Sequence, residues 1–163
     1  MSMNNLDLLP KKNVLSLFMT CGFPSLSQSR KIFNEIISHQ PDIIEFGLPF
    51  SDPMADGPVI QEANKLALKS KITTKKSLNL IKQFKTKKLK TSFVVMCYLN
   101  TVQKYGINKF INDIKGIVDG IILVDLPFEE EKEIKSQLEK NNQALAGPGF
   151  FELDFEKNSQ LKE

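Results

Sequence analysis

The stretch that decides the fold is residues 42–58, which read Asp-Ile-Ile-Glu-Phe-Gly-Leu-Pro-Phe-Ser-Asp-Pro-Met-Ala-Asp-Gly-Pro. Its first part is typical of a buried strand, in which successive side chains point to opposite faces. Ile43, Glu45 and Gly47 therefore share one face, and the carboxyl of Glu45 lies in an apolar row. Burial of that kind raises the pKa of a carboxyl and keeps it protonated near neutral pH, which suits a general acid.

A proline-stiffened loop follows this strand. Its three prolines restrict φ and Gly57 permits a tight turn, so Asp56 is expected to come back toward the strand end. The carboxyl groups of Glu45 and Asp56 would then meet. Spacing alone leaves other interpretations open, because a glutamate at a strand end can cap a helix or pair with a lysine, and Asp-Gly-Pro is common in turns.

The rest of the chain alternates strand patterns with helical patterns. Strands are predicted over residues 13–20, around Glu45, over 91–97 and over 120–124, and a helical pattern follows each of them. Such alternation indicates parallel βαβ units, and therefore a barrel or a doubly wound sheet.

We predict a domain over residues 1–141 and an atypical tail over residues 142–163. The tail begins with a segment, residues 143–149, that lacks the branched side chains of a buried parallel strand. It also contains Pro148, which cannot donate a hydrogen bond to a strand ladder. A fifth strand in this segment is therefore doubtful.

Composition and charge exclude several classes of protein. The chain has 163 residues, of which 41% are hydrophobic and 25% charged, and a net charge of +3, all typical of a soluble globular protein. The lysine-rich run at residues 85–90 has no accompanying aromatic or glycine pattern, so we interpret it as a solvated helix end and expect no nucleic-acid partner. No window approaches the roughly 18 apolar residues of a membrane span, and the polar start lacks a signal-peptide core, so we expect a cytoplasmic protein without membrane contact.

Neither a metal nor a cofactor is predicted. Cys21 and Cys97 are isolated and have no histidine nearby, which argues against a zinc site or a disulfide framework. His39 is the chain's single histidine, so no Ser-His-Asp or Cys-His triad can be built from this sequence. The glycine patterns of dinucleotide-binding and NTP-binding loops do not occur.

Four motifs at predicted strand ends resemble those of the tryptophan synthase α subunit. They are residues 18–24 (Phe-Met-Thr-Cys-Gly-Phe-Pro), residues 45–58, residues 96–100 (Met-Cys-Tyr-Leu-Asn) and residues 124–127 (Val-Asp-Leu-Pro). The resemblance covers roughly residues 13–141 and implies an α/β fold of the (β/α)8 TIM-barrel type. A complete barrel of this type usually needs about 250 residues, so the chain would hold about the first four β/α units and the tail.

The resemblance also implies an activity, a partner and roles for four residues. The reaction is the cleavage of indole-3-glycerol phosphate to indole and glyceraldehyde 3-phosphate, in tryptophan biosynthesis. Glu45 would protonate ring carbon 3, Asp56 would stabilise the charge on the ring nitrogen, and Phe18 and Tyr98 would line the indole pocket. Both aromatic residues also fit ordinary core packing. The implied partner is the tryptophan synthase β subunit, in an α2β2 assembly.

This sequence departs from the family pattern in two respects. Lys71 stands where the family usually has a glycine, and no segment matches the glycine-rich loops that hold the substrate phosphate in the family. Three functions therefore remain open. The chain is a lyase subunit completed by a second chain, a non-catalytic half-barrel that keeps partner-facing loops around Asp52, Asn100 and Asp125, or another phosphate-handling barrel. The third would be a pentulose-phosphate epimerase or an indole-glycerol-phosphate synthase, and it needs metal-binding histidines or a catalytic strand-end lysine that this sequence does not offer.

Overall fold

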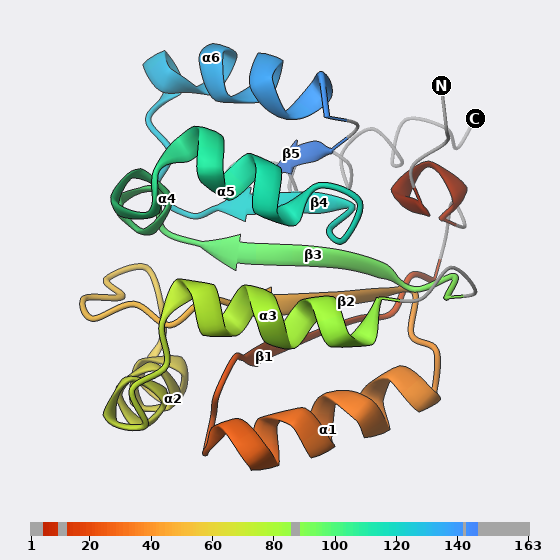
Figure 1. Ribbon diagram of the computed structural model, residues 1–163, viewed down its shortest axis with the longest axis vertical. Helices are drawn as coiled ribbons and strands as arrows, with labels where there is room; N and C mark the ends of the chain where they lie inside the picture. Colours follow the sequence, from red (N-terminus) through yellow and green to blue (C-terminus); the bar gives the residue numbers. More distant parts are fainter. Residues whose placement is uncertain (1–4, 10–12, 86–88, 142, 147–163) are drawn as a thin grey trace, which may run out of the picture.

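The computed structural model describes residues 5–9, 13–85, 89–141 and 143–146. Within these residues a single parallel sheet is formed by β1 (Ser16–Thr20), β2 (Ile43–Gly47), β3 (Ser92–Cys97), β4 (Gly120–Leu123) and β5 (Ala144–Ala146). The spatial order β1-β2-β3-β4-β5 repeats the order in the sequence (Figure 1). A doubly wound sheet reverses its strand order part-way, so the sequential order decides in favour of barrel-type winding.

Helices connect successive strands. The described elements are the 3-10 helix η1 (Asn5–Leu8) and the α-helices α1 (Leu26–Ser38), α2 (Pro58–Lys69), α3 (Thr74–Phe84), α4 (Leu99–Tyr105), α5 (Ile107–Ile114) and α6 (Phe128–Glu139). The helical pattern that follows β3 forms two helices, α4 and α5, which meet at Gly106 with φ +92°. None of the described helices is both long and apolar enough to cross a membrane.

Local sequence signals fix the starts of three helices. The Ser25 hydroxyl accepts a hydrogen bond from the Gln28 N–H, and the Thr73 hydroxyl accepts one from the Lys76 N–H. Each is an N-cap that satisfies a backbone donor in the first helical turn. Pro58 occupies the first turn of α2, where its missing N–H costs no helical hydrogen bond.

The two faces of the sheet differ in how they are covered. The face that carries Phe46 and Phe93 packs against helices, and α1 contributes Phe33, whose ring centroid lies 4.7 Å from that of Phe46. The opposite face carries Ile43 and Val94. Among the described residues outside the sheet, that small cluster is covered by Leu6 and Leu9, in and just after η1, and by Val124, just after β4. Figure 1 shows η1 at one end of the sheet, away from α2 and α4. Helices on one face only are the arrangement of a barrel wall.

The doubt about a fifth strand was wrong. β5 pairs in parallel with β4, with Ala144 opposite Gly120, and the Ala144 N–H donates to the Asp119 carbonyl at 3.1 Å. Leu145 supplies the buried contact on the helix-covered face. Glycine suits position 120 because a Cβ there would lie 2.9 Å from the Leu6 side chain. The remainder of the predicted tail, including Pro148, lies outside the described residues.

Lys85 does not behave as a solvated helix end. Its ammonium lies 2.6 Å from the Asp119 carboxylate, and both side chains are largely buried. The same ammonium lies 4.8 Å from the centre of the Phe93 ring, and the Asp119 carboxylate also accepts the Phe93 N–H. The first lysine of the run thus ties the end of α3 to the starts of β3 and β4. Residues 86–88 lie outside the described part of the chain.

Lys71 adopts the left-handed backbone conformation that glycine favours. It follows the C-cap Ser70 of α2 with φ +55°, and its N–H donates to the Leu68 carbonyl. A residue with a Cβ in this conformation costs roughly 1–2 kcal/mol. The departure noted in the sequence therefore has a structural consequence, which is a strained C-terminus of α2.

Lys71→Gly is expected to stabilise the fold by about 0.5–1 kcal/mol, because the relief of the left-handed strain exceeds the entropy that glycine loses on folding. Urea unfolding followed by circular dichroism measures the change. Ser70→Gly is the matched control, because Ser70 has φ −78° and gains no relief. That control should lose stability by up to about 1 kcal/mol, and equal changes in the two variants would contradict the prediction.

Candidate active site

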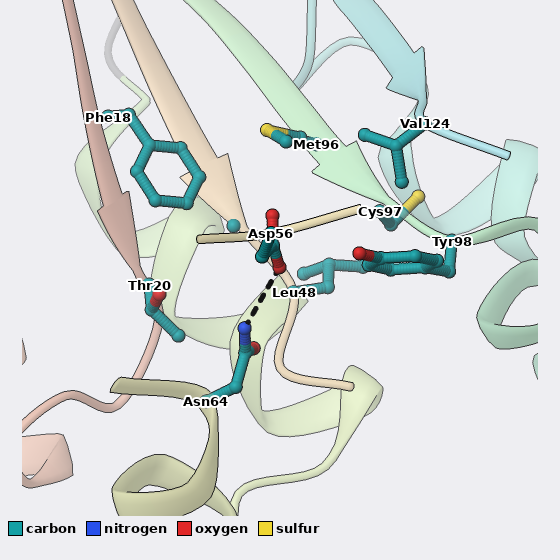
Figure 2. A pocket seen from close by; sticks show the side chains of 10 residues that line it. Phe18, Thr20, Leu48, Asp56, Asn64, Met96, Cys97, Tyr98 and Val124 are labelled. Carbon is teal, nitrogen blue, oxygen red and sulfur yellow. Dashed lines mark hydrogen bonds between the residues drawn. The ribbon is translucent and has the colours of Figure 1, made fainter. Parts of the chain in front are cut away.

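A small pocket lies at the carboxyl ends of the strands, the end where parallel α/β barrels place their active sites (Figure 2). Its lining residues are Phe18, Thr20, Gly47, Leu48, Asp56, Asn64, Met96, Cys97, Tyr98 and Val124. Three of the four site residues expected from the sequence, Phe18, Asp56 and Tyr98, are among them. The cavity of about 10 Å³ has room for little more than a water molecule.

Asp56 lies in the middle of this pocket, between Phe18 and Tyr98 (Figure 2). The Asn64 amide donates a hydrogen bond of 3.2 Å to its carboxylate, and the Tyr98 hydroxyl is a second hydrogen-bond partner. Burial raises the pKa of Asp56 above its usual value, and these two hydrogen bonds oppose the rise. The proline-stiffened loop thus places this carboxyl where it is partly desolvated.

Tyr98 holds the loop between β2 and α2 against the end of β3. Its ring is 6% exposed and stacks on Phe50, with centroids 4.6 Å apart and planes inclined by 20°. Its hydroxyl accepts the Ala55 N–H at 3.1 Å. Burial raises the pKa of Tyr98, and the nearby Asp56 adds to the rise. The phenol therefore stays protonated, so that its oxygen can accept from the Ala55 N–H while its O–H donates to Asp56.

Gly47 makes room for Phe18. A Cβ built on Gly47 would lie 2.7 Å from the end of the Phe18 ring, a distance that real Cβ atoms essentially never show. The ring can therefore lie across the end of β2 only because residue 47 has no side chain. Phe18 thereby reaches the pocket from β1.

Glu45 does not line the pocket. Its carboxylate accepts the Ser16 hydroxyl at 2.5 Å, and the strand register aligns Glu45 with Phe18, two residues beyond Ser16. The carboxylate is thus held toward the start of β1, whereas Asp56 lies at the other end of the strands. Among the described interactions none joins the two carboxyl groups, because the Glu45 carboxylate is bound by the Ser16 hydroxyl. That the two groups meet in catalysis stays a prediction.

Sequence reasoning missed Asn64, which is 4% exposed. Its amide oxygen accepts the Phe50 N–H at 3.1 Å, and its amide nitrogen donates to Asp56 and to the Ile60 carbonyl. The available signal was a polar residue between Ala63 and Ala67 on the apolar stripe of α2. A buried amide is stable only when its hydrogen bonds are made, so such a residue indicates a specific partner. Ser16, the partner of Glu45, was also missed.

The described residues provide neither a reactive cysteine nor a metal site. Cys21 and Cys97 are free and buried, and burial raises the pKa of the Cys21 thiol to about 12 and that of Cys97 still further. Thiols of this kind are poor nucleophiles because the thiolate is the reactive form. Among the described residues no cluster of histidine, cysteine, aspartate and glutamate could hold a metal ion.

Comparison of the sequence with known proteins shows the family to which the chain belongs. The profile of the tryptophan synthase alpha chain family matches residues 6–146. The chain belongs to this family. It is 37% identical to the tryptophan synthase alpha chain of Petrotoga mobilis over 83% of this chain and 52% of that protein. It is 41% identical to that of Clostridium acetobutylicum over 76% of this chain and 47% of that protein.

Solved structures agree with this assignment. The alpha chain from Legionella pneumophila superimposes with a TM-score of 0.78 at 32% identity, over 90% of this chain and 56% of that one. The alpha subunit from Campylobacter jejuni gives a TM-score of 0.77 at 30% identity, over 88% and 57%. Both neighbours are alpha-chain TIM barrels, and the fold is of that type. The chain spans about half the length of the relatives it matches.

Removing the Tyr98 hydroxyl should raise the pKa of Asp56 further, because a hydrogen bond that favours the carboxylate is lost. The carboxyl 13C shift of Asp56, followed by NMR from pH 2 to 8, measures the effect in Tyr98→Phe. The chain's other tyrosine supplies the matched control, and Tyr105→Phe should leave the Asp56 titration unchanged. An Asp56 pKa that is unchanged or lower in Tyr98→Phe would contradict the prediction.

Proposed function

We propose that this chain carries the acid groups and the ring pocket for the cleavage of indole-3-glycerol phosphate to indole and glyceraldehyde 3-phosphate. The observation that carries the proposal is the position of Asp56, held by Asn64 and Tyr98 beside the Phe18 ring, at the active-site end of a family barrel wall. Because the chain spans about half the length of its relatives, the activity is assigned to an assembly that contains the other half.

The proposed mechanism is a retro-aldol cleavage in which Glu45 and Asp56 have different parts. Glu45 donates a proton to ring carbon 3, which leaves a positive charge on the ring nitrogen. The hydroxyl on the adjoining side-chain carbon then gives its proton to the Glu45 carboxylate that the first step leaves. The carbonyl of glyceraldehyde 3-phosphate forms, and the electrons of the broken carbon-carbon bond return to the ring. Asp56 accepts a hydrogen bond from the ring N–H and stabilises the positive charge.

Two movements must precede this chemistry. The cavity of about 10 Å³ is too small for an indole ring, so lining side chains must move apart. The Glu45 carboxyl must also leave the Ser16 hydroxyl and turn toward the pocket. In the described structure the Asp56 side chain thus lines the pocket, and the Glu45 side chain does not.

A second candidate function is binding of the tryptophan synthase β subunit without catalysis, and one observation favours it. Met54 and Val59, at and just after the tip of the loop between β2 and α2, are 83% and 79% exposed. Exposed apolar side chains next to polar ones indicate an interaction surface. Asp52 and Asn100, in the partner-facing loops expected from the sequence, are also exposed. Asp125 is exposed as well, and its carboxylate accepts the Leu99 N–H at 2.6 Å.

The catalytic roles are tested in the chain combined with the carboxyl-terminal half of the Clostridium acetobutylicum relative. Glu45→Gln should lower the rate of indole release from indole-3-glycerol phosphate by about 100-fold to 10,000-fold, the usual range for general acid catalysis. Asp56→Asn should also reduce turnover strongly, and both variants should still bind indole. Glu62→Gln, an exposed acid on α2, is the control. A near-parental rate for Glu45→Gln would rule out Glu45 as the proton donor.

Met54→Asp should weaken binding of the β subunit of that same relative by about tenfold or more, because a charge would be buried in an apolar contact. Surface plasmon resonance measures the affinity. Leu8→Asp is the matched control, since Leu8 is an exposed apolar residue at the opposite end of the sheet. Equal losses in the two variants would show that this loop is not the binding surface.

A further inference from the structure

A second, larger groove opens beside the Asp56 pocket. It has a volume of about 340 Å³ and lies between the loop after β2, the junction of α2 and α3, and helix α4. Phe50 lines the groove, and the Tyr98 ring on which it stacks lines the pocket, so these two rings form the boundary between them. The groove falls within the size range of small-molecule sites, about 300–1,000 Å³. The proposed cleavage chemistry does not use it.

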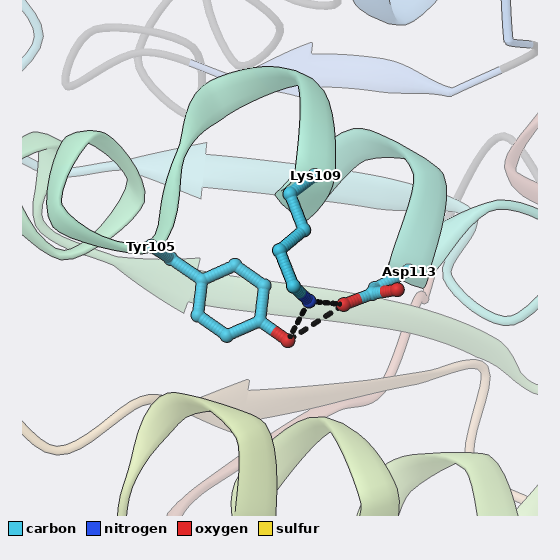
Figure 3. A network of polar contacts seen from close by, with 3 residues as sticks. All are labelled: Tyr105, Lys109 and Asp113. Atoms are coloured by element: carbon cyan, nitrogen blue, oxygen red, sulfur yellow. Dashed lines mark hydrogen bonds and ion pairs between the residues drawn. The ribbon is translucent and has the colours of Figure 1, made fainter.

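One side of the groove is apolar and fixed in place. Phe50, Leu68, Ile72 and Tyr105 supply this surface. The Tyr105 ring is oriented by its hydroxyl, which donates to Asp113 at 2.6 Å and accepts from the Lys109 ammonium at 2.8 Å (Figure 3). A flat apolar ligand would therefore meet side chains that already have defined positions.

The other side of the groove is cationic. Lys75 from α3 and Lys104 from α4 line it, and none of its described lining residues is an aspartate or glutamate. Lys104 has no ion-pair partner within the described part of the chain. Lys75 acts electrostatically on Asp113, and that carboxylate is already bound by Lys109 and Tyr105. The two lysines thus leave positive charge uncompensated at the groove.

Hydrogen-bond donors accompany this charge. Thr101 is only 8% exposed and lines the groove, yet its hydroxyl has no hydrogen-bond partner among the described residues. The first turn of the eleven-residue helix α3 also lines the groove at Thr74 and Lys75. Backbone N–H groups at these first positions have no partner within the helix and favour a negative charge. The Thr73 hydroxyl already accepts the Lys76 N–H, so the N–H groups of Thr74 and Lys75 remain available to a ligand.

We propose that this groove binds a small organic anion that joins a flat apolar ring to a phosphate or carboxylate group. The ring would lie against Phe50 and Tyr105. The anionic group would lie between Lys75 and Lys104, where the Thr101 hydroxyl and the first turn of α3 donate to it. This site is separate from the Asp56 pocket and needs no residue outside the groove.

Ligand-observed saturation-transfer NMR on the full chain at low ionic strength tests the proposal with three probes. Phenyl phosphate carries both features, inorganic phosphate only the charge, and phenol only the ring. Phenyl phosphate should bind with a Kd on the order of 1 mM, and it should displace phenol while inorganic phosphate competes only weakly. Benzoate in place of phenyl phosphate distinguishes a carboxylate ligand from a phosphate ligand. Absence of phenyl phosphate binding at 10 mM, or equal affinity for phenol, would overturn the proposal.

Charge reversal locates the site. Lys104→Glu and Lys75→Glu should each weaken phenyl phosphate binding by about tenfold or more, since both cations act on the ligand at short range. Lys82→Glu on the exposed side of α3 makes the same change in net charge away from the groove and should alter the affinity less than twofold. Equal weakening in all three variants would mean non-specific attraction and would overturn the proposal. Circular dichroism confirms that each variant is folded.

Discussion

The placement of β2 between β1 and β3 is the constraint on which the site depends. Both edges of β2 are hydrogen bonded, and the register aligns Phe18, Glu45 and Val94 across three strands. Neighbouring residues of parallel strands in register share a face, so one acid is fixed within an otherwise apolar row. The ladder continues past the strand end, where the Leu48 N–H donates to the Met96 carbonyl at 2.9 Å. The loop that carries Asp56 therefore starts from a defined point.

Two side chains then determine where that loop goes. Asn64 accepts the Phe50 N–H near the loop's start and donates to the Asp56 carboxylate near its end. Tyr98 accepts the Ala55 N–H from the opposite side. These groups are buried or half-buried, and a buried polar group that loses its partner costs about 1–3 kcal/mol. The same hydrogen bonds that hold the loop also moderate the rise in the Asp56 pKa, so loop structure and site electrostatics are coupled.

Much of this arrangement could be predicted from the sequence. The apolar periodicity placed the first four strands and most helices, and the strand-end motifs indicated Phe18, Asp56 and Tyr98. What failed depended on contacts between distant segments. β5 is too short and too small-sided to show a strand pattern, and it forms because β4 offers it an unpaired edge. The orientation of Glu45 depends on a serine 29 residues earlier, and no local pattern reveals that contact.

The contrast between the two acids follows from what surrounds each of them. Asp56 is enclosed by side chains from α2 and the end of β3, both of which belong to this chain and fix its carboxylate. Glu45 faces the thinly covered side of the sheet, where among the described residues outside the sheet Leu6, Leu9 and Val124 supply the apolar cover. With little packed around it, the carboxyl takes the nearest hydroxyl donor. The position of Glu45 therefore depends on a single hydroxyl contact, whereas that of Asp56 depends on two side chains that also hold its loop.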